Sequence, residues 1–173
     1  GTFSIDYTLT IENIFFRGDE LADLYDFQVI EDLATNFGTF NATPTNPGEY
    51  NVTNLALNFV NTGAINPSNL AVDNTFNGDG QQNILLVDNV SGYVFTLGAI
   101  VEITYTVNLV PNFGSLNIDS FDNMFRVEGD EVENGVTDGQ FFDESNEVEV
   151  PLPRIGVSKV ANNEQFDPNT QRY

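Results

Sequence analysis

The sequence predicts an all-β protein, an antiparallel Ig-like β-sandwich of roughly nine to ten strands. Short segments of alternating apolar and polar residues follow one another closely, and each is bounded by Gly, Pro, Asn or Asp. No amphipathic helix long enough to change the fold class lies between them. Hydrophobic residues make up 40% of the 173 residues, with 15 Phe and 6 Tyr, which is enough to fill a core.

Two segments alternate with a period of two residues. Every odd-numbered residue from Phe3 to Ile11 is apolar or aromatic, and the same holds from Val101 to Leu109. This pattern is typical of a strand with one buried face and one solvated face. Weaker strands are expected at residues 25–30, 50–59, 84–87, 92–97, 123–127, 147–150 and 155–160.

Two short segments, residues 18–24 and 31–37, could each form one or two helical turns. Neither is long enough to change the fold class. We expect one elongated sandwich, with two stacked small sandwiches as the alternative.

The charge of the chain excludes several classes of partner. Acidic residues number 26 against 5 basic ones, so the net charge is -21, and nucleic acid and anionic lipid are repelled. The chain has no Cys and no His, which rules out disulfides, thiol chemistry and His-based triads. No run approaches the roughly 20 apolar residues of a membrane span, so we expect no direct membrane insertion.

Five segments resemble, in order, the landmarks of one repeat family. They are Ile5-Asp-Tyr-Thr-Leu-Thr-Ile-Glu-Asn13, Asp26-Phe-Gln-Val-Ile-Glu-Asp-Leu-Ala34, Ile103-Thr-Tyr-Thr-Val107, Val136-Thr-Asp-Gly139 and Pro153-Arg-Ile-Gly-Val-Ser-Lys-Val160. Together they are similar to the bacterial surface-protein repeat catalogued as domain of unknown function eleven. The resemblance implies a linear tandem array in a giant protein at the bacterial cell surface, with neighbouring copies of the same repeat as partners. Two segments depart from the family pattern, the acidic run 127–134 and the insertion 43–49.

The family repeat opens with the strand that here comes last in the chain, at residues 155–160. We therefore expect residues 1–150 to form the main sandwich, and residues 151–173 to form a proline hinge and the first strand of the next copy. The residues expected at this junction between copies are Pro151, Pro153, Ile155, Val157, Val160, Tyr173 and Gly1.

Calcium is the expected cofactor, because carboxylates, Asn side chains and carbonyls are its usual ligands. One candidate site holds Asp138, Asp143 and Glu144, and resembles an acidic segment of the repeat family. A solvated acidic loop is the alternative there.

A second candidate calcium site holds Asn77, Asp79 and Asn83, for which an Asn/Gly-rich hairpin loop is the alternative. A third acidic group, Glu31 and Asp32 with Asp119 and Asp122, could meet only in three dimensions.

Three functions remain open on the sequence alone. The first is a structural repeat of an extracellular filament or stalk-forming surface adhesin, stacked end to end and stiffened by calcium. The second is an adhesive module that recognises a glycan or a cell surface through aromatics such as Phe15, Phe16, Phe141 and Phe142. The third is a non-covalent polymer in which residues 154–173 of one subunit complete the sheet of the next. An enzyme is not expected, since a chain this acidic contains carboxylate pairs by accident.

Overall fold

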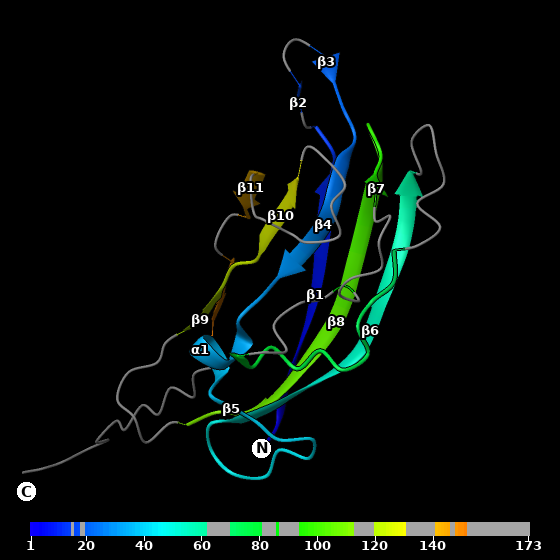
Figure 1. The fold of residues 1–173 in the computed structure, drawn as a ribbon. Helices are drawn as coiled ribbons and strands as arrows, with labels where there is room; N and C mark the ends of the chain where they lie inside the picture. The colour runs from blue at the N-terminus through cyan, green and yellow to red at the C-terminus, as the bar shows by residue number, and fades with distance from the viewer. Residues whose placement is uncertain are drawn as a thin grey trace, which may run out of the picture.

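The protein is an all-β sandwich of two four-stranded sheets that lie face to face (Figure 1). The structure is a computed structural model that describes residues 1–14, 16–17, 20–61, 70–80, 86, 94–112, 120–130, 141–145 and 148–151. One cluster of buried apolar side chains fills the space between the two sheets. The predicted fold class is confirmed at this level, whereas the Ig-like type and the number of strands stay predictions.

The first sheet has the strand order β1-β8-β6-β5. Its members are β1 (Phe3–Glu12), β8 (Ile100–Val110), β6 (Glu49–Asn61) and β5 (Thr39–Phe40). β8 pairs antiparallel with β1 along all ten residues of β1 and with β6 on its other side. Every second residue of β8 is buried, as its alternating sequence predicts. The two clearest sequence predictions are therefore confirmed.

The second sheet has the order β11-β10-β4-β7. Its members are β11 (Phe141–Glu144), β10 (Arg126–Asp130), β4 (Leu24–Ile30) and β7 (Val94–Phe95). β4 is central and mostly buried, and its Phe27 stacks on Phe95 of β7 with ring centroids 4.5 Å apart.

Smaller elements complete the ends of the sandwich. β2 (Phe16–Arg17) and β3 (Glu20–Leu21) pair beyond one end. At the other end lies α1 (Leu33–Phe37), whose first turn is capped by Asp32. β9 (Ser120–Asn123) pairs there with β12 (Val148–Pro151). Among the described residues, no helix is long and apolar enough to cross a membrane.

Two sequence predictions were wrong. Residues 123–127 do not form one strand, since they include the end of β9 and the start of β10. β9 pairs with β12, whereas β10 pairs with β4. Between them, the backbone N–H and carbonyl of Phe125 both bond Ser145. Within 18–24, the described residues contain no helical turn. Glu20 and Leu21 form β3, Ala22 and Asp23 belong to no helix or strand, and Leu24 begins β4, where it pairs with Phe95. The predicted strand 155–160 and most of 84–87 lie outside the described residues.

β1 and β10 run in the same direction along the sandwich, from the α1 end toward the β2–β3 end (Figure 1). Asn13, just after β1, fixes the β2–β3 end, since its buried side-chain amide donates to the carbonyls of Ala22 and Phe95. β12 runs the opposite way, because it is antiparallel to β9. The described chain therefore begins β1 at Phe3 and ends β12 at Pro151 near the same end, the α1 end.

Candidate functional site

A buried polar cluster joins the two sheets in the middle of the sandwich. Glu31, which follows β4, has only 1% of its surface exposed. Its Oε1 accepts hydrogen bonds from the hydroxyl of Tyr105 on β8 and from the side-chain amide of Asn123 at the end of β9. Tyr7 on β1 stacks on Tyr105 with ring centroids 5.3 Å apart. Two residues of the first sheet and one of β9 thus surround the carboxyl group that follows β4.

Only one of the two oxygens of this carboxyl group accepts hydrogen bonds in the described structure. Glu31 Oε2 and the Tyr7 hydroxyl are both buried and have no hydrogen-bond partner in the described structure. Burial raises the pKa of Glu31 to about 7, although the bonds from Tyr105 and Asn123 act in the opposite direction. Burial and the nearby Glu31 likewise raise the pKa of the Tyr7 hydroxyl. The cluster holds an acid that an additional donor or cation would stabilise in its charged form.

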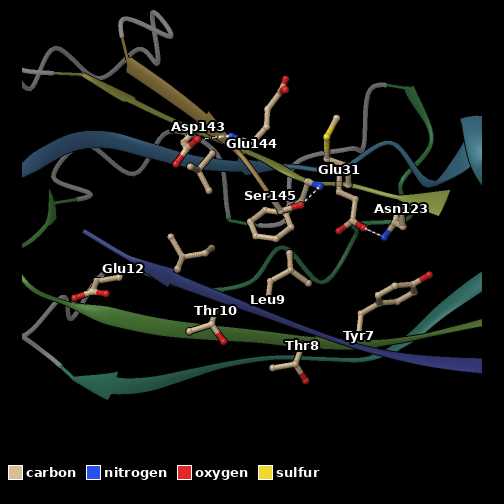
Figure 2. A pocket seen from close by; sticks show the side chains of 14 residues that line it. Tyr7, Thr8, Leu9, Thr10, Glu12, Glu31, Asn123, Asp143, Glu144 and Ser145 are labelled. Carbon is tan, nitrogen blue, oxygen red and sulfur yellow. Dashed lines mark hydrogen bonds between the residues drawn. The ribbon is translucent and has the colours of Figure 1, made fainter. Parts of the chain in front are cut away.

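The cluster lies at the inner end of a cavity of about 410 Å³ on one flank of the sandwich. β1 forms one wall, and β10, β11 and the residues beside them form the other. Figure 2 shows Leu9 pointing into this space while Thr8 and Thr10 point away from it. Glu31, after β4, and Asn123, on β9, reach toward it from the side opposite β1.

A second cavity of about 480 Å³ continues the first toward the β2–β3 end. The two share Ile11, Glu12, Val127 and Asp143, so they form one groove between β1 and β11. Its walls include most of the large hydrophobic side chains that the described structure exposes, namely Ile14, Met124, Phe141 and Phe142. Phe142 is 60% exposed, and the Arg126 guanidinium lies 3.9 Å above its ring centre.

Both walls of the groove end in edge strands. β1 is the outermost strand of its sheet and β11 the outermost strand of the other, and both lie on this flank. Within the described part of the chain, no strand pairs with the outer edge of β1. A strand edge with no described partner, beside a groove that exposes large apolar side chains, has the features of a site that accepts an added strand.

The candidate calcium residues are spread over several places. Asp143 and Glu144 lie on exposed β11, where the Asp143 carboxylate accepts from the Glu144 backbone N–H at 2.9 Å. Asn77 accepts from the Asp79 backbone N–H at 2.8 Å in a turn beside Leu33. Asp138 and Asn83 lie outside the described residues. No group of three or more acidic side chains that could hold a metal gathers in the described ranges.

The third acidic group separates at the turn after β4. Glu31 points inward, whereas Asp32 is exposed and accepts from the backbone N–H of Thr35 at 3.1 Å as the cap of α1. Only the backbone of Asp122 is described, and Asp119 lies outside the described residues. Of the junction residues, Gly1 is exposed and Pro151 ends β12, while Pro153, Ile155, Val157, Val160 and Tyr173 lie outside the described part.

Comparison of the chain with protein-family models, with curated proteins and with solved structures finds no significant match. The resemblance to the surface-protein repeat therefore stays a prediction.

The sequence did not reveal the partners of Glu31. Tyr7 and Tyr105 occupy inward positions of the two clearest strands and lie directly opposite each other in the β1–β8 pair. Two tyrosines at matching inward positions were the available signal that a polar group lies between the sheets, because a buried hydroxyl needs a partner.

Proposed function

We propose that this chain is a structural repeat of an extracellular bacterial filament or stalk-forming surface adhesin, whose copies associate end to end. The observation that carries the proposal is the groove between β1 and β11, with an open strand edge and exposed Ile14 and Phe142 along it. Exposed apolar side chains that line one groove are a feature of surfaces covered by a partner. The resemblance to tandem surface repeats makes a neighbouring copy the proposed partner.

A chain with two copies joined from Tyr173 to Gly1 tests this proposal against the single chain. We expect the two-copy chain to be elongated in small-angle scattering and to melt at a higher temperature than the single chain, because stability in an array includes a neighbour term. Two copies that melt at the temperature of the single chain and tumble independently would refute it.

The copies could be linked covalently or by exchange of a strand, and the same groove supports both arrangements. The mass of the native assembly under denaturing conditions separates them. A covalent array keeps a mass many times the 19.1 kDa of this chain, whereas a strand-exchanged polymer falls to one unit.

An adhesive module is the second candidate, and exposed Phe141 and Phe142 favour it. Aromatic side chains beside a groove are common in surfaces that bind ligands. Binding of the single chain to a glycan array, lost on Phe142→Ala, would support this function. A chain that binds no glycan but associates with its own copies would favour the structural repeat.

Calcium stiffening of loops or junctions is part of the proposal for the structural repeat. Asp143, Glu144 and Asp79 are exposed and can take part only together with other ligands, of which Asp138 and Asn83 are the ones the sequence suggests. The test is to add calcium to protein that a chelator has stripped of metal ions. An increase in its melting temperature would support calcium stiffening.

A further inference from the structure

The groove beside β1 and the last segment of the chain have complementary patterns. Along β1, inward-facing Ile11 and Leu9 form an apolar stretch, followed by Tyr7 next to the half-satisfied Glu31. In the segment 154–160, alternation places two apolar side chains and a lysine on one face, namely Ile155, Val157 and Lys159. In β1 and in the segment 154–160 alike, two apolar side chains on one face are followed by a polar one.

We propose that residues 154–160 of one copy add to the open edge of β1 of the next copy, antiparallel to it, with Ile155, Val157 and Lys159 facing Ile11, Leu9 and the Tyr7–Glu31 pair. This pairing rests on the proposed function. It specifies which strand fills the groove and which residues make the contact at the inner end of the groove.

Two contacts together fix the direction of the added strand, namely Lys159 at Tyr7 and Arg154 at Glu12. When Lys159 lies opposite Tyr7 in an antiparallel pair, Arg154 lies opposite Glu12 on the outer face, so two unlike charges face each other. The parallel arrangement would place Lys159 at Ile11 and leave Glu31 Oε2 facing the apolar Ile155. The antiparallel direction alone satisfies both ends of the groove.

Charge supports the same occupant. The segment 152–173 carries three of the five basic residues of the chain and only two of its 26 acidic ones. The groove is bordered by Glu12 and Asp143, by Glu128 and Glu144, which both pair with Arg126, and by the buried Glu31. A chain with a net charge of -21 would otherwise repel its own copies.

The lysine contact is favourable although a buried ion pair usually gains little. The cost of desolvation normally offsets the attraction between the two charges. Here Glu31 is already buried with one oxygen unpaired, so the lysine ammonium is the only group that docking newly removes from water. The apolar stem of the lysine would pack along the wall formed by Leu9 and Phe125, and its ammonium would reach the Glu31 carboxylate.

The strand must come from another copy, because the distance within one copy is too long. Pro151 pairs with Ser120, three residues beyond Asn123 toward the α1 end, and Ile11 lies four residues beyond Tyr7 toward the β2–β3 end. These seven residue steps correspond to roughly 23 Å along the sandwich. The four residues from Pro151 to Ile155 span at most about 14 Å.

The pairing also explains how copies could follow one another in a line. Within the described fold, β1 begins and β12 ends at the α1 end. A strand that arrives antiparallel to β1 brings the preceding copy to the opposite, β2–β3 end. The neighbours then lie at opposite ends of each sandwich.

Cross-linking tests the register, and the chain suits it because it contains no Cys. Thr8→Cys in one chain and Ser158→Cys in another should form an intermolecular disulfide on mixing and oxidation, since these positions are opposite each other on the outer face. Thr10→Cys and Asp6→Cys are matched controls on the same exposed face, two residues to either side. The same pairs are also placed across the two copies of the joined chain. Equal yields at all three positions, or no disulfide at any of them, would overturn the pairing.

The lysine contact has its own test. We expect Lys159→Met and Glu31→Gln each to weaken association of the chains by about tenfold, and the double variant to be no weaker than either one. Arg172→Gln is the control, since it removes a charge from the same segment outside the proposed strand. An equal loss for Arg172→Gln would show that only net charge matters and refute the contact.

The outcomes also separate this inference from the proposed function. Association of copies without selective cross-linking to Thr8 would refute the strand pairing and leave the end-to-end repeat standing. Absence of association in both the mixed chains and the joined chain would refute both.

Discussion

The hydroxyl of Tyr105, on the central strand β8, donates a hydrogen bond to the carboxylate of Glu31, which follows β4 in the opposite sheet. One buried acid is thereby shared between two sheets, and its second oxygen, Oε2, has no partner. Both the stability and the proposed assembly of the protein depend on this group.

The stability of the protein should depend on pH through Glu31. Its pKa rises from 4.5 to about 7 on folding, so the folded protein binds more protons than the unfolded chain between these values. Stability should therefore decrease as the pH rises from 4.5 to 7, by about 3 kcal/mol at most. Glu31→Gln should abolish this decrease, because Gln keeps an oxygen for Tyr105 and Asn123. Urea unfolding at a series of pH values measures it, and an identical decrease in the variant would show that another group is responsible.

Glu49 should have the opposite pH dependence. Its carboxylate accepts from the side chain of Asn46 and from the backbone N–H groups of Thr45 and Asn46, which lowers its pKa to about 2. The stabilisation is present above the unfolded pKa of 4.5 and is lost as the pH falls toward 2. Glu49→Gln should lower the melting temperature at pH 7 and leave it nearly unchanged below pH 2, which thermal scans at the two pH values would measure. A difference between variant and parent that is the same at both pH values would contradict this account.

Asn13 should be essential for closing the β2–β3 end of the sandwich. Its amide donates to the Ala22 and Phe95 carbonyls, so Asn13→Ala leaves two acceptors without that donor and should cost about 2 kcal/mol or more. Asn61→Ala is the matched control, since its exposed side chain donates to Gly98 at the same end. Equal losses in chemical unfolding of the two variants would contradict the role of burial.

Gly78 should tolerate no side chain. It has φ +69°, and an added Cβ would lie 2.6 Å from the Leu33 side chain, which is fully buried. Gly80, with φ +54° and open space around it, is the matched control. Gly78→Ala should therefore destabilise the protein more than Gly80→Ala by about 2 kcal/mol or more. Similar unfolding midpoints for the two variants would mean that the Leu33 packing adapts.

If calcium stiffens the loops as proposed, adding calcium should raise the melting temperature of protein that a chelator has stripped of metal ions. Asp143→Asn combined with Glu144→Gln should reduce this increase, because both carboxylates belong to the candidate site. Glu102→Gln is the control, since it removes a carboxylate from β8, away from both candidate sites. A melting temperature that calcium does not change would defeat the calcium part of the proposal.

The strands that could be predicted from sequence are those with a buried and a solvated face. β1 and β8 alternate without interruption, so the sequence indicated their position and the face each one buries. β11 could not be recognised, because Phe141 and Phe142 are followed by Asp143 and Glu144 and all four side chains are exposed. An edge strand without a buried face has no periodic pattern.

The candidate site was less predictable than the fold. Glu31 and Asp32 look alike in the sequence, and only the turn between β4 and α1 directs one inward and the other into the cap of the helix. Asn123 contacts Glu31 from β9, which pairs with β12 in a separate two-stranded sheet. Such a contact depends on tertiary packing, which local pattern cannot indicate.

The positions of Phe3 and Pro151 near the same end of the sandwich have a mechanical consequence. Tension applied at these two points alone would peel β1 and β12 from their neighbours one hydrogen bond at a time, which requires little force. A neighbour's strand held antiparallel along β1 would be pulled from the far end, parallel to its own axis. All of its hydrogen bonds would then resist together, and the array would bear load in shear.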